Sequence, residues 1–413
     1  MQRLEKYIYN LVKNNSAIKD FLVKVYQFVF CFFGLIKGKI VTEYDYTEIR
    51  NSFFGFHDRA SMNKEGQVLS HIAESKFVNG AGHASITVSD IHSGETHVVA
   101  STKCCNFQQG SLLTWFSDTQ IIYNDVNEQG PITIIKDLNS DAIQTLPFHF
   151  FSLAPNSKFV SSVNFYRFGQ GLNGYGYDIN YPSQYIEDGE SHFSTAKISD
   201  FVIFDIEESE TVYRLSIQEA KKQSVGLIDD GYFYFSHSCF SPSSNKIYFL
   251  LRSSNSFYNS SQLFSYDLVE KQLIALPSGG MVSHLSWLSD STIIAFCNTK
   301  NDKSFAYYVF DLTTGSVESA GILGLDKDGH PHARSADIFY TDTYPDKERR
   351  QYLFCVNLPQ NSVQTILSVY SPLSFRGVGR VDFHPRLSLC ENYLTIDTPH
   401  NSDRTQLILQ LKK

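Results

Sequence analysis

Five histidines occupy equivalent positions in a repeated sequence pattern. They are His57, His237, His284, His330 and His384, and each opens a unit of apolar strand, short turn and second strand. The units recur roughly every 50 residues, and residues of one register converge on a common axis when such repeats close into a ring. Neutral imidazoles bind Mn²⁺, Fe²⁺, Ni²⁺ or Zn²⁺, and an unligated histidine can act as a general base near neutral pH.

Acidic, amide and guanidinium groups accompany these histidines along the chain. They are Asp58, Gln108, Gln109, Asp328 and Asp382, together with Arg59, Arg380 and Arg386. Arginine binds carboxylates in a bidentate geometry. A metal, a base and an arginine beside a carboxylated sugar suit β-elimination, because they acidify and remove the proton next to the carboxylate. The alternative is a structural role, because histidines at this register also form hydrogen bonds to a neighbouring repeat unit of the ring.

Two local motifs concentrate these groups. Asp328-Gly329-His330-Pro331-His332 is followed by a Thr-Asp-Thr-Tyr-Pro-Asp stretch that contains Asp342. In Arg380–Arg386 the polar residues alternate, so that Arg380, Asp382, His384 and Arg386 share one face of an extended strand. Such a face is costly to bury unless it meets water or a ligand.

A second series of repeats interleaves with the histidine units and indicates the fold. Alternating apolar runs that end in an acidic or polar turn, such as FVIFDIEESETVYRL, predict hairpins. Two interleaved hairpin series predict an all-β, seven-bladed β-propeller over residues 39–413. Because a propeller must close its ring, Lys39–Ile49 is expected to pair with Gln406–Lys413 in the last blade.

One long segment interrupts the repeat at about residues 164–198. It is rich in Gly, Tyr and Asp and contains Tyr175 and Tyr177. A long loop on a rigid scaffold is where binding residues concentrate, so this insertion is expected to form a lid or wall that contacts substrate. A solvated surface insertion is the alternative.

Residues 1–38 differ from the rest and predict an α-helical extension. The apolar run FLVKVYQFVFCFFGLI is flanked by lysines and is shorter than the roughly 20 residues that span a bilayer. It does not resemble a cleaved signal peptide. It is expected to pack on the propeller or a partner; the alternatives are peripheral membrane contact through residues 1–40 and an uncleaved anchor.

The bulk composition narrows the partners and the compartment. The formal net charge is −8 and the basic residues do not cluster, which excludes a nucleic-acid-binding footprint. Seven cysteines form no Cys-x-x-Cys pair, as expected for reduced thiols. The protein is therefore expected in the cytoplasm, with association with the inner face of the membrane as the variant that the N-terminal segment allows.

Several motifs resemble the oligogalacturonate-lyase-like propeller proteins, many of which are encoded among bacterial capsule and O-antigen genes. They are GFHD, QQGSLLTW, NGYGY, FSH–CFSP, VSHLSW, DGHP, TDTYPD, DFHPR and DRTQL. The resemblance covers about residues 50–413 and implies a metal-dependent, β-eliminating enzyme, with manganese as the first metal. It implies His284, His330 and His384 as metal ligands, Gln109 as an amide partner and His237 as the base. The family has a glutamine close to its last two histidines, whereas here Asp382 occupies that strand.

These observations lead to one expected function and two alternatives. The expected function is binding, and cleavage by β-elimination, of an acidic oligosaccharide or sugar intermediate at the histidine-rich top face. Arg380 and Arg386 join His237 as catalytic candidates. Substrate contacts are expected from His57, Asp58, Gln108, Gln109, Tyr175, Tyr177, Asp328, Asp342 and Asp382. One alternative is a non-catalytic scaffold or glycan-binding module of surface-polysaccharide assembly. The other is a glycosyltransferase-associated or hydrolytic enzyme that uses carboxylates such as Asp328, Asp342 and Asp382.

Overall fold

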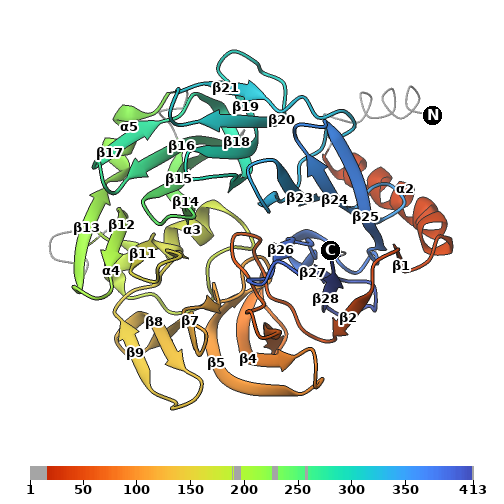
Figure 1. Cartoon of the computed structure of the whole chain (residues 1–413), viewed down its shortest axis with the longest axis horizontal. Helices are drawn as coiled ribbons and strands as arrows, with labels where there is room; N and C mark the ends of the chain where they lie inside the picture. The colour runs from red at the N-terminus through yellow and green to blue at the C-terminus, as the bar shows by residue number, and fades with distance from the viewer. Residues whose placement is uncertain (1–15, 188, 190–196, 226–230, 256–258, 412–413) are drawn as a thin grey trace.

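The chain forms a seven-bladed β-propeller with a helix on its rim, in a computed structural model that describes residues 16–187, 189, 197–225, 231–255 and 259–411 (Figure 1). Blade 1 contains β3 (Gln67–Ala73), β4 (Ala81–Asp90) and β5 (Thr96–Asn106). Blade 2 contains β6 (Thr114–Trp115), β7 (Gln120–Asn127), β8 (Gly130–Asp137) and β9 (Ile143–Leu146). Blade 3 contains β10 (Ser152–Leu153), β11 (Phe159–Ser162), β12 (Phe201–Asp205) and β13 (Glu210–Leu215). Blades 4 and 5 contain β14 (Tyr232–Phe240), β15 (Lys246–Ser254), β16 (Asn259–Asp267) and β17 (Gln272–Ala275); and β18 (Ser278–Trp287), β19 (Thr292–Thr299), β20 (Ala306–Asp311) and β21 (Val317–Ser319). Blades 6 and 7 contain β22 (His332–Ala333), β23 (Ile338–Asp342), β24 (Arg350–Asn357) and β25 (Ser362–Tyr370); and β26 (Arg386–Leu387), β27 (Tyr393–Thr398) and β28 (Thr405–Gln410). The predicted fold class is confirmed.

Two N-terminal strands complete the last two blades. β2 (Tyr46–Ile49) pairs antiparallel with β28, from Tyr46 opposite Leu409 to Ile49 opposite Gln406, and so closes the ring. The predicted closure is confirmed for these four residues. β1 (Ile40–Thr42) instead pairs with β25 and adds a fifth strand to blade 6. The expected single strand over Lys39–Ile49 is thus divided between two blades.

Phenylalanine-rich layers between the sheets make up the core. The largest apolar cluster among the described residues joins blades 1 to 4 and includes Phe150, Phe151 and Phe168, each less than 1% exposed. The rings of Phe201 and Phe249 stack across blades 3 and 4 with centroids 4.0 Å apart. Aromatic pairs of this kind stabilise facing sheets beyond the area they bury, so the propeller offers a rigid scaffold for side chains at its axis.

The α-helices of the described residues lie at three places around the propeller, and a short 3-10 helix, η1 (Gly377–Gly379), precedes β26. α2 (Ser16–Ile36) lies on the outer rim beside β25 (Figure 1). α3 (Phe165–Gly171) and α4 (Ser183–Ile186) belong to the insertion between β11 and β12, and a third short helix, α5 (Ile217–Gln223), follows β13. Among the described residues, no helix has the length and apolar character needed to cross a bilayer. Residues 1–15, which were expected to form part of the helical extension, lie outside the described residues.

A buried histidine in blade 1 makes the fold sensitive to acid. His71 lies on β3, and its Nε2 accepts the backbone N–H of Ser111 at 3.2 Å, which favours the neutral ring. Burial lowers its pKa from 6.5 to about 4. Between pH 6.5 and 4, His71 binds a proton in the unfolded chain but stays neutral in the folded protein. The free energy of unfolding is therefore highest above pH 6.5 and falls as the pH is lowered toward 4.

Urea unfolding of the His71→Gln variant tests this coupling. In the wild type, this one residue should lower the free energy of unfolding by about 1.4 kcal/mol for each pH unit below 6.5. The His71→Gln variant should be less stable at neutral pH but show a shallower slope between pH 6.5 and 4. The exposed His97 provides the control, and an unchanged slope in His71→Gln would contradict the assignment.

Candidate metal centre

The structure brings the five histidines of the repeat together at the propeller axis. They come from blades 1, 4, 5, 6 and 7, and none is more than 6% exposed. The ring centroids of His284 and His330 are 4.1 Å apart, and those of His330 and His384 are 4.3 Å apart. His57 lies 5.4 Å from His330, and His237 lies 6.4 Å from His284. Histidines at equivalent positions of five repeats therefore form one cluster, as the sequence predicts.

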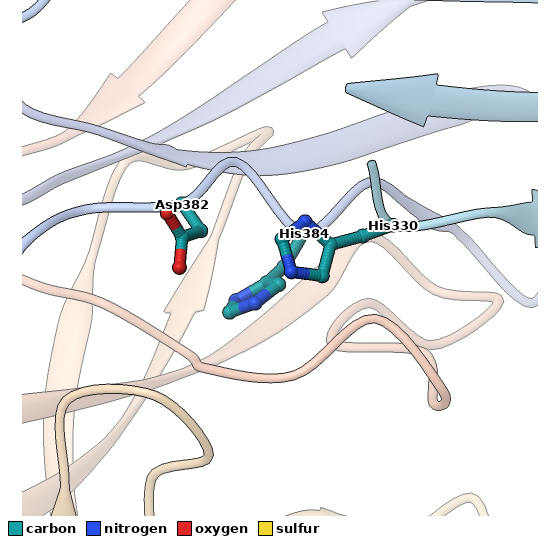
Figure 2. Close-up of side chains that lie close together, drawn as sticks. All are labelled: His330, Asp382 and His384. Atoms are coloured by element: carbon teal, nitrogen blue, oxygen red, sulfur yellow. The ribbon is translucent and has the colours of Figure 1, made fainter. Parts of the chain in front are cut away.

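His330, Asp382 and His384 form the tightest set of possible metal ligands. One donor atom from each lies within 4.8 Å of the others, and Figure 2 shows the three side chains directed toward one another. The Nε2 atoms of His330 and His384 and the Oδ1 atom of Asp382 are buried and have no hydrogen-bond partner. Buried polar atoms are normally paired. Two imidazole nitrogens and a carboxylate oxygen fit a borderline divalent ion, so the residues present are suited to a metal.

Asp342 fixes two of these ligands. It ends β23 and is 1% exposed. Its carboxylate accepts a hydrogen bond from His330 Nδ1 at 2.8 Å and from the backbone N–H groups of His330 and His384 at 2.7 and 3.1 Å. The bond to Nδ1 leaves Nε2 of His330 as the free donor, as in many metal sites with an outer carboxylate. The bond to His384 supports that residue at φ +48°, a conformation that costs free energy without glycine.

His284 is held in a similar way from blade 5. Its Nδ1 lies 3.2 Å from Oδ1 of Asp328, whose other oxygen accepts the Ser283 hydroxyl at 2.6 Å. Asp328 and Asp342, both expected to contact substrate, therefore have carboxylates that bind histidines of the cluster. His284 adds a third imidazole next to His330.

Burial and the neighbouring carboxylates set the pKa values of these histidines. It lowers the pKa of His284 and, with the nearby His330, lowers the pKa of His384 well below 6.5. Burial also lowers the pKa of His330, but the Asp342 carboxylate outweighs it and raises the pKa overall. His284 and His384 are therefore neutral near pH 7, which is the form that binds metal.

His237, the predicted base, lies at the edge of the cluster. Its Nδ1 is buried without a hydrogen-bond partner, and its ring contacts Phe56 edge-on at 5.3 Å. Burial, helped by the nearby Arg252, lowers its pKa well below 6.5, so the ring is a neutral proton acceptor. Its backbone φ of +52° is strained, as is common at functional positions.

Arg380 connects Asp382 to one of the two predicted glutamines, Gln108. Its Nε donates to Asp382 Oδ2 at 2.7 Å and its Nη2 donates to Gln108 Oε1 at 3.1 Å. The Arg380 side chain is 29% exposed, so solvent or a ligand can reach it. Gln109 is 2% exposed, and neither atom of its amide has a partner.

Three other predicted site residues are used by internal contacts. The fully buried Arg386 donates to Asp397 Oδ1 at 3.0 Å and to the Gly55 carbonyl at 2.9 Å. Asp58 binds the Arg59 guanidinium at 2.7 Å and lines a separate cavity of about 400 Å³. His57 Nδ1 donates to the Pro331 carbonyl at 2.8 Å, which links blade 1 to blade 6.

The insertion lies beside the cluster. The Tyr175 ring is 6.2 Å from that of His237, and the pKa of Tyr175 is raised chiefly by burial and is influenced by Arg380. Gly174 packs against Val378, where an added Cβ would come within 3.3 Å of the valine. Tyr177 stacks on Phe165 at 5.1 Å, and its hydroxyl accepts a hydrogen bond from Asn124. Tyr175 is thus the tyrosine nearest to the predicted base.

Arg252 and Tyr344 also belong to this site, although sequence reasoning did not select them. Arg252, on β15, is 8% exposed and donates to the carbonyls of Val282 and Ser283. Tyr344 contacts the ring of His330 at 5.8 Å and lies 5.9 Å from the Arg380 guanidinium. The sequence signal for Arg252 was its position as a lone arginine at the end of the apolar run IYFLLR. Tyr344 lies in the motif that supplies Asp342.

Comparison with solved structures identifies the architecture. An oligogalacturonate lyase in complex with manganese is similar with a TM-score of 0.60 and 10% identity, over 91% of this chain and 98% of that one. The oligogalacturonate lyase of Vibrio parahaemolyticus gives 0.59 and 9%, over 91% and 99%. The chain has the fold of these lyases. The tricorn protease is also similar, with a TM-score of 0.51 and 9% identity over 88% of this chain and 34% of that chain.

Sequence comparison adds no family. No protein-family model matches the chain, and no curated protein matches it. The two lyases share 10% and 9% sequence identity with this chain, and the similarity shows a shared propeller fold.

Proposed function

We propose that the protein is a divalent-metal-dependent lyase that cleaves a carboxylated oligosaccharide by β-elimination. The observation that carries the proposal is the set of three unpartnered, buried donor atoms on His330, Asp382 and His384. His284 is the third imidazole that would complete the site. The manganese in the similar oligogalacturonate lyase makes Mn²⁺ the first ion to test.

The residues around the ligands have separate roles in this proposal. A bound divalent ion would withdraw electron density from the substrate carboxylate and so acidify the neighbouring C–H. Arg380 orients the carboxylate through its guanidinium. His237 accepts the proton from the carbon next to the carboxylate, and the electron pair of that C–H bond forms a C=C bond. The C–O bond to the glycosidic oxygen breaks, and this oxygen keeps the electron pair and takes up a proton from water.

A cleft beside the insertion offers space for the rest of the saccharide. It has a volume of about 620 Å³ and is lined by amides and tyrosines that include Gln170, Asn173 and Tyr166, together with Asp178 and apolar side chains such as Phe165. Tyr175 lines the same cleft and lies next to His237. Amide groups bind sugar hydroxyls and aromatic rings pack on sugar C–H faces, so the cleft suits the units that flank the reacting sugar.

Assay of the His237→Ala variant tests this reaction. Uronate-containing oligosaccharides incubated with Mn²⁺ should yield an unsaturated product that absorbs in the ultraviolet. His237→Ala should lower kcat by about 10²–10⁴-fold while metal binding is retained, because the histidine is proposed to transfer the proton and not to hold the ion. The exposed His97→Ala is the control. No product with any uronate substrate, or full activity in His237→Ala, would reject the proposed mechanism.

A second candidate is a non-catalytic glycan-binding or scaffold protein of surface-polysaccharide assembly. The broad exposed apolar face of α2 favours it, because such a face is suited to holding the propeller at another surface. This candidate predicts saccharide binding without turnover in the same assay.

A further inference from the structure

Helix α2 has a continuous apolar face that the propeller does not cover. Its exposed large apolar side chains are between 43% and 70% accessible: Val25, Phe28, Val29, Phe32, Phe33, Leu35 and Ile36. Every other described helix or strand exposes at most one such side chain. Exposed apolar patches of this size usually mark an interaction surface.

The helical geometry places these side chains on one side. With 3.6 residues per turn, the seven positions fall within an arc of about 160° around the helix axis. Gly34 lies opposite the centre of that arc and is buried. An added Cβ at Gly34 would overlap the carbonyl oxygen of Glu348, so this side of the helix touches the propeller backbone.

Polar contacts fix the orientation of the helix. The buried Arg350 donates from Nη1 to the carbonyls of Gly34 at 3.1 Å and Gly38 at 2.6 Å. Lys37 binds Glu348 at 2.5 Å, and Lys347 lies 5.3 Å from the Phe30 ring. α2 is held on the rim beside β25 (Figure 1). Because the Gly34 side of the helix meets the propeller, the apolar arc on the opposite side is exposed.

Charge identifies the kind of surface that this face fits. Residues 1–39 contain seven Lys and Arg and two Asp and Glu, whereas the whole chain has a formal net charge of −8. Lys37 and Lys39, both exposed, directly follow the helix. A basic segment that carries a broad face of Phe, Val, Leu and Ile has the composition of helices that lie in the interface of anionic membranes.

We propose that α2 binds the surface of an anionic lipid membrane. Phe28 and Phe32, the two most exposed aromatic side chains of the arc, enter the boundary between head groups and acyl chains, and Lys37 and Lys39 lie near the lipid phosphates. The helix lies parallel to the membrane surface and anchors the propeller by its rim. The proposal is independent of the metal centre, since no residue of that centre contributes to α2.

Vesicle flotation of the full-length protein tests the proposal. The wild type should float with vesicles of phosphatidylcholine and phosphatidylglycerol in equal amounts, and much less with phosphatidylcholine alone or in high salt. The double variant Phe28→Glu/Phe32→Glu should reduce the bound fraction more than about tenfold, because two aromatic side chains no longer insert into the membrane interface. The matched control is Val269→Glu/Leu323→Glu, which places the same charges at positions 66% and 80% exposed on blades 4 and 5.

The outcomes separate the membrane from other occupants. Equal flotation of the Phe28→Glu/Phe32→Glu variant, or no flotation of the wild type, would overturn the proposal. A wild-type dimer in sedimentation analysis that becomes monomeric in this variant, without lipid binding, would assign the face to a second copy of the chain instead. Unchanged thermal unfolding of both double variants confirms that the substitutions act at the surface.

Discussion

Replacing Asp342 with asparagine is expected to weaken the affinity for a divalent metal ion by about 10–100-fold. The Asp342 carboxylate accepts the Nδ1 proton of His330 and the backbone N–H groups of both His330 and His384. An asparagine amide can replace one oxygen, but its NH₂ group is a donor and cannot accept the remaining bonds. His330 would then lose the contact that keeps Nε2 directed at the metal position.

Titration calorimetry with Mn²⁺ measures this effect without any substrate. The control is Asp337→Asn, an exposed residue just before the same strand, which should bind Mn²⁺ like the wild type. The thermal unfolding of the metal-free proteins shows whether Asp342→Asn also perturbs the fold. An unchanged dissociation constant in a folded Asp342→Asn variant would contradict the positioning role.

Asp397→Ala is expected to lower the free energy of unfolding by about 3–5 kcal/mol. Asp397 binds the guanidinium of Arg386 at 3.0 Å and accepts the backbone N–H groups of Phe54 and Gly55 at 3.1 and 2.9 Å. Arg386 is fully buried. Removal of the carboxylate would leave a buried cation without its counter-charge and would remove a bond between blades 1 and 7, where the ring closes.

Urea unfolding of a double variant tests this role. Arg386→Leu/Asp397→Leu should be more stable than Asp397→Ala, because it removes both charges and leaves no uncompensated cation. A loss below about 0.5 kcal/mol in Asp397→Ala, typical of surface substitutions, would show that the pair does not hold the ring closed.

The fold could be predicted because each blade repeats the same apolar alternation and polar turn. The pairing of Tyr46–Ile49 followed from the need to close the ring. The pairing of Ile40–Thr42 with β25 did not follow, because the sequence shows that a segment is extended but not which sheet edge is free beside it. The contact of Arg350 with α2 likewise depends on a packing that spans more than 300 residues.

The histidine cluster could be predicted because propeller symmetry converts equal register into proximity. Individual partners could not, since they depend on side-chain direction. Arg386 was expected to share one face of a strand with His384. Residues 380–385 do not form a strand and His384 has a φ of +48°, so the alternation is broken and Arg386 binds Asp397 across β26 and β27. Asp342 was selected for its neighbouring residues, and only the structure places its carboxylate on His330 and His384, the two histidines of the proposed metal site. Arg252 was missed because a charged residue in an apolar strand gives no sign of which blade it faces.

The metal content of the purified protein, measured by inductively coupled plasma mass spectrometry, tests the central claim most directly. After loading with Mn²⁺ and gel filtration, the wild type and the exposed control His97→Ala should retain about one equivalent of metal, whereas folded His330→Ala and His384→Ala should retain less than about a tenth of that. Metal absent from the wild type, or equally present in all four proteins, would contradict a metal centre at His330, Asp382 and His384.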